Sequence, residues 1–257
     1  GGTPIFFKAG NGAWLVDESG AEWLDAYGGH AVASTGHSHP RVVSAIAEQA
    51  GRLFFYSTAV PHPLREQLAT ALAERCPGPL GRVFFCNSGA EANENALHLA
   101  RKATGRTAVA SVTGGWHGRT VATLACCDGR SYEAGALRAG MALSARVAFD
   151  DVASLDAVLD DTMAALIVEP VQGMAGARDC SPEFLAAARR LCTERGIALL
   201  FDEVQCGVGR SGAFTAAELY GVAPDGLTLA KGLGSGCPIG AVVVGPMLAT
   251  GIGVGDL

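Results

Sequence analysis

Four apolar runs in the chain are each followed directly by side chains that could take part in chemistry. The pairs are 82–86 with Asn87-Ser-Gly-Ala-Glu91, 164–168 with Glu169, 197–201 with Asp202, and 227–230 with Lys231. In open α/β sheets, ligands bind at the carboxyl ends of the strands. If the four runs are neighbouring strands, two acids, an amide, a lysine and an anion-binding turn meet at one edge of one sheet.

The turn Ser88-Gly-Ala-Glu91 lies between a predicted strand and a predicted helix. Free N–H groups and the helix dipole make a helix N-terminus an anion site, and Gly89 allows close approach to the backbone. Ser88, Gly89 and Ala90 are therefore candidates for holding a phosphate. A plain capping box, with Ser88 and Glu91 satisfying the helix end, is the alternative, and both can hold.

Asp202 and Lys231 each follow a strand that emerges from the core. A carboxylate at such a place needs a partner, and the protonated nitrogen of a pyridine ring is one candidate. A desolvated lysine among small residues has a lowered pKa and becomes nucleophilic. The alternatives are a structural ion pair or helix cap for Asp202 and an ordinary surface lysine for Lys231.

The segment Gly114-Gly-Trp-His-Gly-Arg-Thr120 adds an aromatic ring and a cation. Trp116 could stack on a planar ring, and Arg119 could bind a carboxylate with its two-pronged guanidinium. The alternatives are a core tryptophan and a surface ion pair. The pair His37 and His39 has a spacing that could bind metal, but a turn before Pro40 explains it better, and we expect no metal site.

Hydrophobic periodicity predicts the elements that position these residues. Helices are expected over 40–53, 63–74, 90–103 and 182–194, and a small hairpin is expected from strands 13–16 and 23–24. Further strands are expected over 82–86, 107–112, 164–168, 197–201, 227–230 and 241–244. Strands that alternate with helices indicate an α/β fold with a mostly parallel central sheet flanked by helices.

Composition narrows the class of protein. Charged residues make up 17% of the 257 residues, against a usual share of ~25%, and there are 35 glycines. The net charge of −6 argues against a nucleic-acid partner, and no apolar run approaches the ~18 residues of a membrane span. The eight cysteines show no C-x-x-C pair, so we expect buried free thiols and a cytoplasmic protein.

Five segments in order resemble the class III (ornithine- and acetylornithine-type) pyridoxal-phosphate (PLP) aminotransferases. They are Asn87-Ser-Gly-Ala-Glu-Ala-Asn-Glu94, Trp116-His-Gly-Arg119, Glu169-Pro-Val-Gln-Gly173, Phe201-Asp-Glu-Val-Gln-Cys-Gly-Val-Gly-Arg210 and Leu229-Ala-Lys-Gly-Leu-Gly234. The resemblance covers nearly the whole chain, including Gly36-His-Ser-His-Pro40. It implies fold-type I of the PLP-dependent transferases.

The resemblance also implies roles for the cofactor-binding residues. Lys231 would hold PLP through a Schiff base and move the proton during the reaction, and Asp202 would pair with the pyridine nitrogen. Gln205 would contact the ring hydroxyl region, with Glu169 and Val204 as further cofactor contacts.

For the remaining site residues, the resemblance implies that Ser88, Gly89 and Ala90 cradle the phosphate. Trp116 would stack on the ring, in a place where family members usually have Phe or Tyr. Arg119 would bind the substrate carboxylate.

Met174 departs from the family pattern. Many ornithine-type members carry Glu directly after the Gln-Gly of the Glu169-Pro-Val-Gln-Gly173 motif, where it helps the site alternate between amino donor and oxo-acid acceptor. The departure makes ornithine less secure as the donor than N-acetylornithine or a related acylated diamino acid.

The chain also stops before the point where relatives continue into a small C-terminal domain. We therefore interpret it as truncated at both ends. We expect an N-terminal segment over 1–50, with a small hairpin and a helix, and a large PLP-binding domain over 51–257. The resemblance implies a homodimer with its site at the subunit interface.

The predicted activity is a PLP-dependent transaminase that moves an amino group from an ω-amino donor such as N-acetylornithine to 2-oxoglutarate. With that donor the enzyme would serve arginine biosynthesis. The alternatives are a PLP-dependent aminomutase or decarboxylase of the same fold, and a non-catalytic fragment. A nicotinamide-binding protein is a weaker alternative, because no G-x-G-x-x-G follows an early strand.

Overall fold

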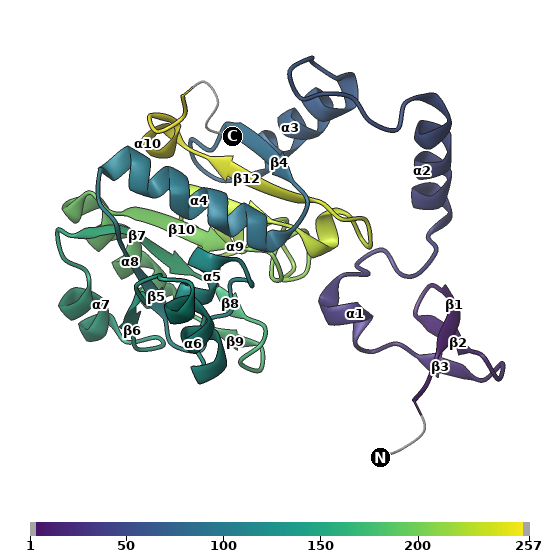
Figure 1. Ribbon diagram of the computed structural model, residues 1–257, viewed down its shortest axis with the longest axis horizontal. Helices are drawn as coiled ribbons and strands as arrows, with labels where there is room; N and C mark the ends of the chain where they lie inside the picture. Colours follow the sequence, from purple (N-terminus) through teal and green to yellow (C-terminus); the bar gives the residue numbers. More distant parts are fainter. Residues whose placement is uncertain (1–3, 254–257) are drawn as a thin grey trace.

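The computed structural model describes residues 4–253, which contain a central seven-stranded sheet with helices on both faces (Figure 1). The strand order is β4-β12-β11-β10-β7-β5-β6. The bounds are Arg82–Cys86 (β4), Ala108–Val112 (β5), Ala145–Val147 (β6), Met163–Val168 (β7), Ala198–Asp202 (β10), Gly226–Leu229 (β11) and Gly240–Val244 (β12). A short ribbon of Val171–Gln172 (β8) and Arg178–Asp179 (β9) lies beside it.

Strand pairing confirms the prediction of a mostly parallel sheet. The strands β6, β5, β7, β10 and β11 run parallel to one another, and β12 runs antiparallel to both β11 and β4. β4 therefore points the same way as β11. The carboxyl ends of β4, β7, β10 and β11 consequently lie at the same edge of the sheet, as the sequence led us to expect.

Helices cover the two faces of the sheet in separate cores. The helices are α3 (Pro63–Arg75), α4 (Gly89–Thr104), α5 (Val121–Cys126), α6 (Arg130–Arg138), α7 (Val152–Val158), α8 (Pro182–Arg195), α9 (Ala216–Tyr220) and α10 (Pro246–Ala249). Ala198 and Leu200 of β10 face the core of α4, α5 and α10, whereas Leu199 and Phe201 face the core of α3, α7, α8 and α9. Successive side chains of a strand point to opposite faces, so both faces of β10 must be apolar.

The helix α4 begins where the Ser88 hydroxyl accepts a hydrogen bond from Glu91 N at 3.2 Å. Glu91 in return accepts from Asn87 N at 2.7 Å, so the predicted pairing of Ser88 and Glu91 forms, with the bond of Glu91 to the residue before the N-cap rather than to the N-cap itself. The helix ends at Gly105, whose φ of 69° suits a left-handed C-cap. Its buried stripe faces the sheet and contains one polar side chain, Asn93.

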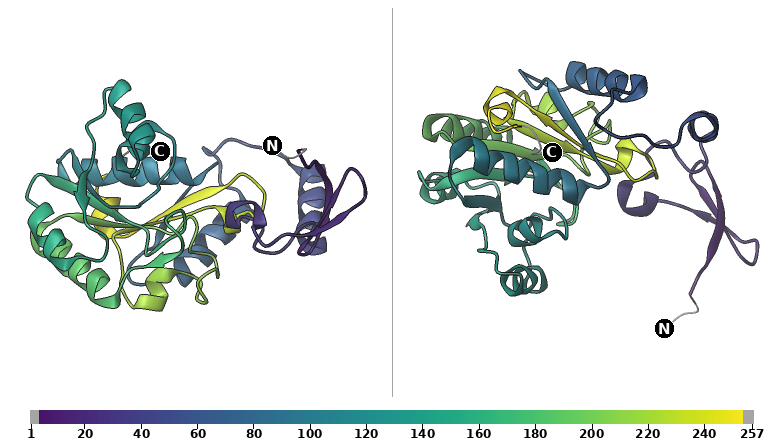
Figure 2. Two further views of the ribbon diagram at one scale, coloured as in Figure 1. Left: turned by 90° about the horizontal axis from the view of Figure 1, so that it is seen from below. Right: turned by 45° about the horizontal axis from the view of Figure 1, so that its top comes forward.

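The N-terminal segment lies apart from the sheet, to its right in Figure 1, and both views of Figure 2 agree. It contains β1 (Phe7–Asn11), β2 (Trp14–Asp17), β3 (Glu22–Leu24), α1 (Gly28–Ala31) and α2 (Pro40–Arg52). Within the described chain, no residue before Leu72 is buried. The division at residue 50 remains a prediction.

Several expectations need correction. The predicted two-stranded hairpin is a three-stranded antiparallel sheet, because β1 pairs with β2. Four of the five residues of β1 are exposed, so the strand has no buried face whose alternation could have indicated it. The short elements β6, α5, α6 and α7 were not predicted, because stretches of three to nine residues carry little periodicity.

All eight cysteines are free, as expected, but Cys237 is exposed and Cys86 is only half-buried. The expectation that all of them are buried was therefore wrong. None of the helices in residues 4–253 is long and apolar enough to cross a membrane.

Candidate functional site

A cavity of about 530 Å³ lies at the carboxyl edge of the sheet. Every residue that the sequence singled out for cofactor or substrate lines it. These residues are Ser88, Gly89, Ala90, Trp116, Arg119, Glu169, Asp202, Val204, Gln205 and Lys231. Five strands (β4, β5, β7, β10 and β11) and the loops that follow them therefore supply one site.

The start of α4 forms one end of this cavity. The N–H groups of Gly89 and Ala90 lie in the first turn of the helix, where no intrahelical acceptor exists. A Cβ on Gly89 would lie 2.6 Å from Cγ1 of Val204, so the helix start can pack this closely against the loop after β10 only with glycine. This end of the cavity can bind an anion.

Asp202 is the last residue of β10 and is 3% exposed. Its Oδ2 accepts hydrogen bonds from Asn93 Nδ2 at 2.7 Å and from His117 Nδ1 at 2.8 Å. Its Oδ1 accepts one from Val204 N at 3.0 Å. A carboxylate offers about four acceptor positions, so one position on Oδ1 is left for a donor in the cavity.

Lys231 follows β11 and lies in the left-handed backbone region with a φ of 43°. Such a backbone is unfavourable for a residue with a side chain, and it is often found at functional sites. Burial lowers the pKa of the Lys231 amine, while the charges of Asp202 and Glu169 act against this shift. Within residues 4–253 the amine has no hydrogen-bond partner, so it is available to a ligand.

Glu169 ties together two walls of the cavity. It accepts hydrogen bonds from Trp116 N at 2.7 Å and from Gly173 N at 3.4 Å. Burial, reinforced by the charge of Asp202, raises the pKa of Glu169 to about 7. Through these hydrogen bonds, Glu169 fixes the loop that contains Trp116 and the turn at Gly173. Because of its raised pKa, Glu169 adds little negative charge to the cavity below neutral pH.

The remaining walls are mostly apolar. Val32, Met174, Pro238 and Ile239 line them, and Met174 is 54% exposed at the position where the sequence departs from its family pattern. Arg119 lines the same cavity, and its guanidinium has no partner within residues 4–253. This cation is free to bind a carboxylate from a substrate.

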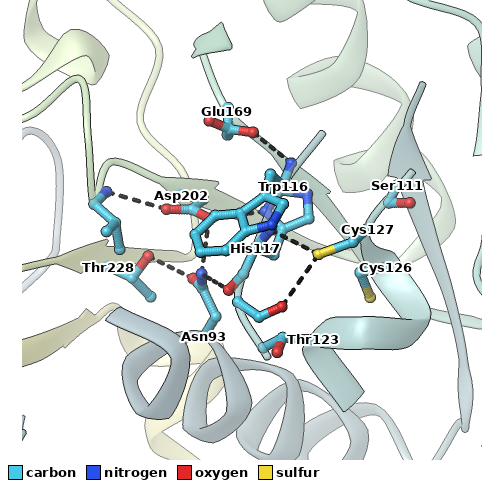
Figure 3. A network of polar contacts seen from close by, with 12 residues as sticks. Asn93, Ser111, Trp116, His117, Thr123, Cys126, Cys127, Glu169, Asp202 and Thr228 are labelled. Atoms are coloured by element: carbon cyan, nitrogen blue, oxygen red, sulfur yellow. Dashed lines mark hydrogen bonds and ion pairs between the residues drawn. The ribbon is translucent and has the colours of Figure 1, made fainter. Parts of the chain in front are cut away.

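Sequence reasoning missed the residues behind Asp202. Asn93 donates to both Asp202 and the backbone oxygen of His117, and its own oxygen accepts from Thr228 Oγ1 at 2.7 Å. Figure 3 shows the side chains of Asn93 and His117 converging on Asp202. The sequence did contain one signal for Asn93. It is four residues after Gly89 on α4, so it lies one turn further along the helix face that reaches the cavity.

Of the two histidines near the N-terminus, His37 has a structural contact, whereas Nδ1 of His39 has no hydrogen-bond partner in the described part of the chain. His37 Nε2 lies 2.6 Å from Asp25 Oδ2, so this histidine stabilises the N-terminal turn. In the part of the chain that the structure describes, no three His, Cys, Asp or Glu side chains are grouped to hold a metal.

Taken together, the donors and acceptors fit a flat, phosphorylated heterocycle with a basic ring nitrogen and a carbonyl group. The helix start suits its phosphate, the open position on Asp202 suits a ring N–H, and Lys231 suits the carbonyl. Trp116 supplies an aromatic ring on the cavity wall.

Comparison with known proteins agrees with this geometry. The chain is 41% identical over 241 residues to an acetylornithine aminotransferase of Halalkalibacterium halodurans, covering 93% of the chain and 62% of that relative. An N-acetylornithine aminotransferase structure from Stenotrophomonas maltophilia matches with a TM-score of 0.82 and 32% identity, over 98% of this chain and 65% of that one. A taurine:2-oxoglutarate aminotransferase from Bifidobacterium kashiwanohense, in complex with PLP and glutamate, matches with a TM-score of 0.90 and 28% identity, over 97% and 62%.

The chain thus spans less than two thirds of the length of these relatives. The family model for class-III aminotransferases matches residues 1–256. On these grounds, and on a site that unites the five motifs, the chain belongs to the class-III aminotransferase family.

Proposed function

We propose that the protein is a PLP-dependent transaminase that uses Lys231 to bind its cofactor. The observation that carries this proposal is the single cavity that brings together a free lysine amine, the start of α4 and the open acceptor position of Asp202. When bound, PLP supplies a carbonyl carbon that joins to an amine and a protonated ring that withdraws electrons.

The residues around the cavity would bind and orient this cofactor. Ser88, Gly89 and Ala90 would hold the phosphate, since two of their N–H groups are free at the helix start. Asp202 would keep a proton on the ring nitrogen, because its carboxylate is fixed by three donors and retains one open position. Trp116 would cover one face of the ring, and Gln205 and Val204 would border it.

Lys231 would also handle the proton. The Nζ of Lys231 would act as a general base that takes a proton from the reacting carbon of the donor, and then as a general acid that gives a proton back. Its lowered pKa favours the neutral amine that such a base requires.

We propose N-acetylornithine as the amino donor and 2-oxoglutarate as the acceptor. Arg119 is the only arginine on the cavity wall among the described residues, and both compounds carry a carboxylate that it can bind. The relative from Halalkalibacterium halodurans, named as an acetylornithine aminotransferase, supports this donor. Such a reaction would place the protein in arginine biosynthesis.

We further propose a cytoplasmic homodimer. The eight unpaired cysteines favour a reducing compartment. The aromatic run Phe54, Phe55 and Tyr56 is 60–87% exposed, and exposed apolar surface of this kind marks a contact with another protein surface.

The test is to incubate the purified chain with PLP, reduce it with borohydride and map the modified peptide by mass spectrometry. We expect a pyridoxyl group on Lys231. Lys231→Arg should abolish the label because arginine cannot form the bond, whereas Lys8→Arg, at an exposed lysine of β1, should leave it on Lys231. A folded protein without any label at Lys231 would contradict the proposal.

A further inference from the structure

One stretch of the N-terminal segment returns to the cavity. Residues 28–36, called the strap below, begin with α1 and lie next to the loop that follows β11 (Figure 1). Thr35 N donates to Ser235 Oγ at 3.1 Å, and the hydroxyl oxygens of the two residues lie 2.7 Å apart. A Cβ on Gly232 would lie 2.7 Å from Ser34 Oγ, so glycine at this position leaves room for the strap. The strap therefore packs against the loop that begins with the proposed cofactor lysine.

Val32 is the strap residue that lines the cavity. It is half-buried, and the same cavity is lined by Lys231 and Arg119. Its side chain has no donor or acceptor, so it offers a ligand apolar contact. Because the strap touches the residues that follow Lys231, Val32 borders the part of the cavity where the amine of a donor meets the cofactor.

The strap begins with a strained stretch of backbone. Gly28, Gly29, His30 and Ala31 have φ values of 60°, 59°, 63° and 61°, all in the left-handed region. Histidine and alanine seldom adopt this conformation, because their Cβ atoms approach the backbone too closely. Strain of this kind persists only where surrounding contacts fix it, and it is often found at functional sites. This left-handed turn leads directly into Val32.

Asp25 and His37 tie the two ends of the strap together. Asp25 Oδ1 accepts from Tyr27 N at 3.0 Å and from Gly28 N at 2.8 Å, and its Oδ2 lies 2.6 Å from His37 Nε2. The hydrogen bonds from His37 and Gly28 hold the pKa of Asp25 below its ordinary value. A carboxylate has no proton to donate, so His37 Nε2 is the donor. One carboxylate thus closes the loop that carries Val32.

Both residues of this pair are attached to the small antiparallel sheet. Asp25 N donates to Ala13 O at 2.8 Å, and His37 N donates to Gly12 O at 2.8 Å. Gly12 N donates back to His37 O at 3.0 Å, and a Cβ on Gly10 would lie 2.8 Å from Cβ of His37. The sheet of β1, β2 and β3 is therefore the base from which the strap reaches the cavity.

We propose that Val32 is a specificity-determining residue for the amino donor, and that Asp25 is a positioning residue that holds it in place through the strap. Val32 contacts the carbon chain of the donor next to its reacting amine, while Arg119 binds the carboxylate of the donor. The strap selects the donor and leaves the binding of the cofactor itself unchanged. This inference rests on the proposed PLP function.

The experiment compares the dissociation constants of two ligands without turnover, from the quenching of tryptophan fluorescence. Pyridoxamine phosphate has no donor chain. The second ligand is a stable conjugate in which a C–N single bond joins the cofactor to the δ-amine of N-acetylornithine. Val32→Ala should weaken binding of the conjugate about three- to tenfold, the effect of losing the contacts of one or two methyl groups, and should hardly change that of pyridoxamine phosphate. Val43→Ala, at an exposed position of α2, is the matched control and should change neither.

Asp25→Ala releases the strap and should weaken binding of the conjugate about tenfold, again without an effect on pyridoxamine phosphate. Asp25→Asn keeps an oxygen for the two backbone N–H groups at the start of the strap, so it should recover most of the affinity. Asp17→Ala is the matched control, because Asp17 accepts its side-chain hydrogen bonds inside the hairpin of β2 and β3. It should leave the affinity for the conjugate unchanged.

Equal losses for both ligands in Val32→Ala or Asp25→Ala would overturn the donor-specific role and indicate a structural one. An unchanged affinity for the conjugate in Val32→Ala would overturn it as well. If the unaltered protein binds pyridoxamine phosphate as tightly as the conjugate, the inference fails and the proposed function stands. Failure of the unaltered protein to bind either ligand would overturn the proposed function together with this inference.

Discussion

At the scale of single residues, burial sets the acid-base character of the groups near the sheet edge. Glu203, next to Asp202, is fully buried and accepts from Ala216 N at 2.6 Å and Ala217 N at 2.8 Å. Burial raises the pKa of this carboxyl to about 7, from an ordinary value of 4.5. Glu203 therefore fixes the start of α9 and also titrates near neutral pH.

This shift predicts a pH dependence of stability. The folded state binds the Glu203 proton more tightly than the unfolded chain, so the contribution of Glu203 to stability is fully present below about pH 4.5 and is lost as the pH rises through 7. Glu169, whose pKa is raised in the same way, acts in the same direction. Each of the two groups should lower the free energy of unfolding by on the order of 3 kcal/mol over this pH range. Urea unfolding of the chain should show this fall between about pH 5 and pH 8.

Glu203→Gln should reduce that fall by about half, because Glu203 no longer titrates while Glu169 still does. Glu183→Gln, at an exposed position of α8, is the matched control and should leave the fall intact. If both variants lose stability with pH in parallel, Glu203 does not have the raised pKa.

At the scale of elements, the start of α4 depends on the neighbouring strand β12. A Cβ on Gly240 would lie 2.3 Å from the backbone oxygen of Ser88 and 2.9 Å from Cys86 Sγ. The first residue of β12 must therefore be glycine if the turn before α4 is to close against it. The proposed phosphate site is built on this contact.

We expect Gly240→Ala to destabilise the protein by about 2 kcal/mol, since backbone atoms must move to remove the clash. It should also weaken PLP binding, because Ser88 lies at the proposed phosphate site. Urea unfolding and PLP titration measure the two effects. Gly51→Ala, a helical position with open space around its Cβ, should not reduce stability. Unchanged stability in Gly240→Ala would contradict the packing described for Ser88.

At the scale of the whole molecule, burial is distributed unevenly along the chain. The described residues before Leu72 contain no buried side chain, whereas the sheet strands β7, β10, β11 and β12 are buried throughout. Segments with few buried contacts open locally at low cost in free energy. The N-terminal segment and the sheet should therefore differ in local stability.

Limited proteolysis of the chain should cut within residues 4–62 first and leave the sheet and its helices intact. Mass spectrometry of the products locates the cuts. The exposed run Phe54 to Tyr56 suits chymotrypsin, and Phe184 and Phe201, which are fully buried, serve as internal controls. Early cuts after Phe184 or Phe201 would show that the sheet opens as readily as the N-terminal segment.

The sequence by itself determined the long elements and the chemically active residues at their ends. The strand Arg82–Cys86 has the bounds that its pattern predicted, and the helix starts at Pro40, Pro63 and Pro182 are those that proline indicated. Ser88, Glu169, Asp202 and Lys231 followed from the same patterns. These features depend on neighbouring residues in the chain, so local chemistry is enough to predict them.

Only the tertiary structure decided which distant residues meet. The strand order places β12 between β4 and β11, and it brings Asn93 to Asp202, 109 residues away, and to Thr228, 135 residues away. No local pattern distinguishes a buried asparagine that orients a carboxylate from one that caps a loop. The free energy of such a contact exists only after the sheet has assembled, and for that reason the spacing of Gly89 and Asn93 predicted a shared helix face but not the contact of Asn93 with Asp202.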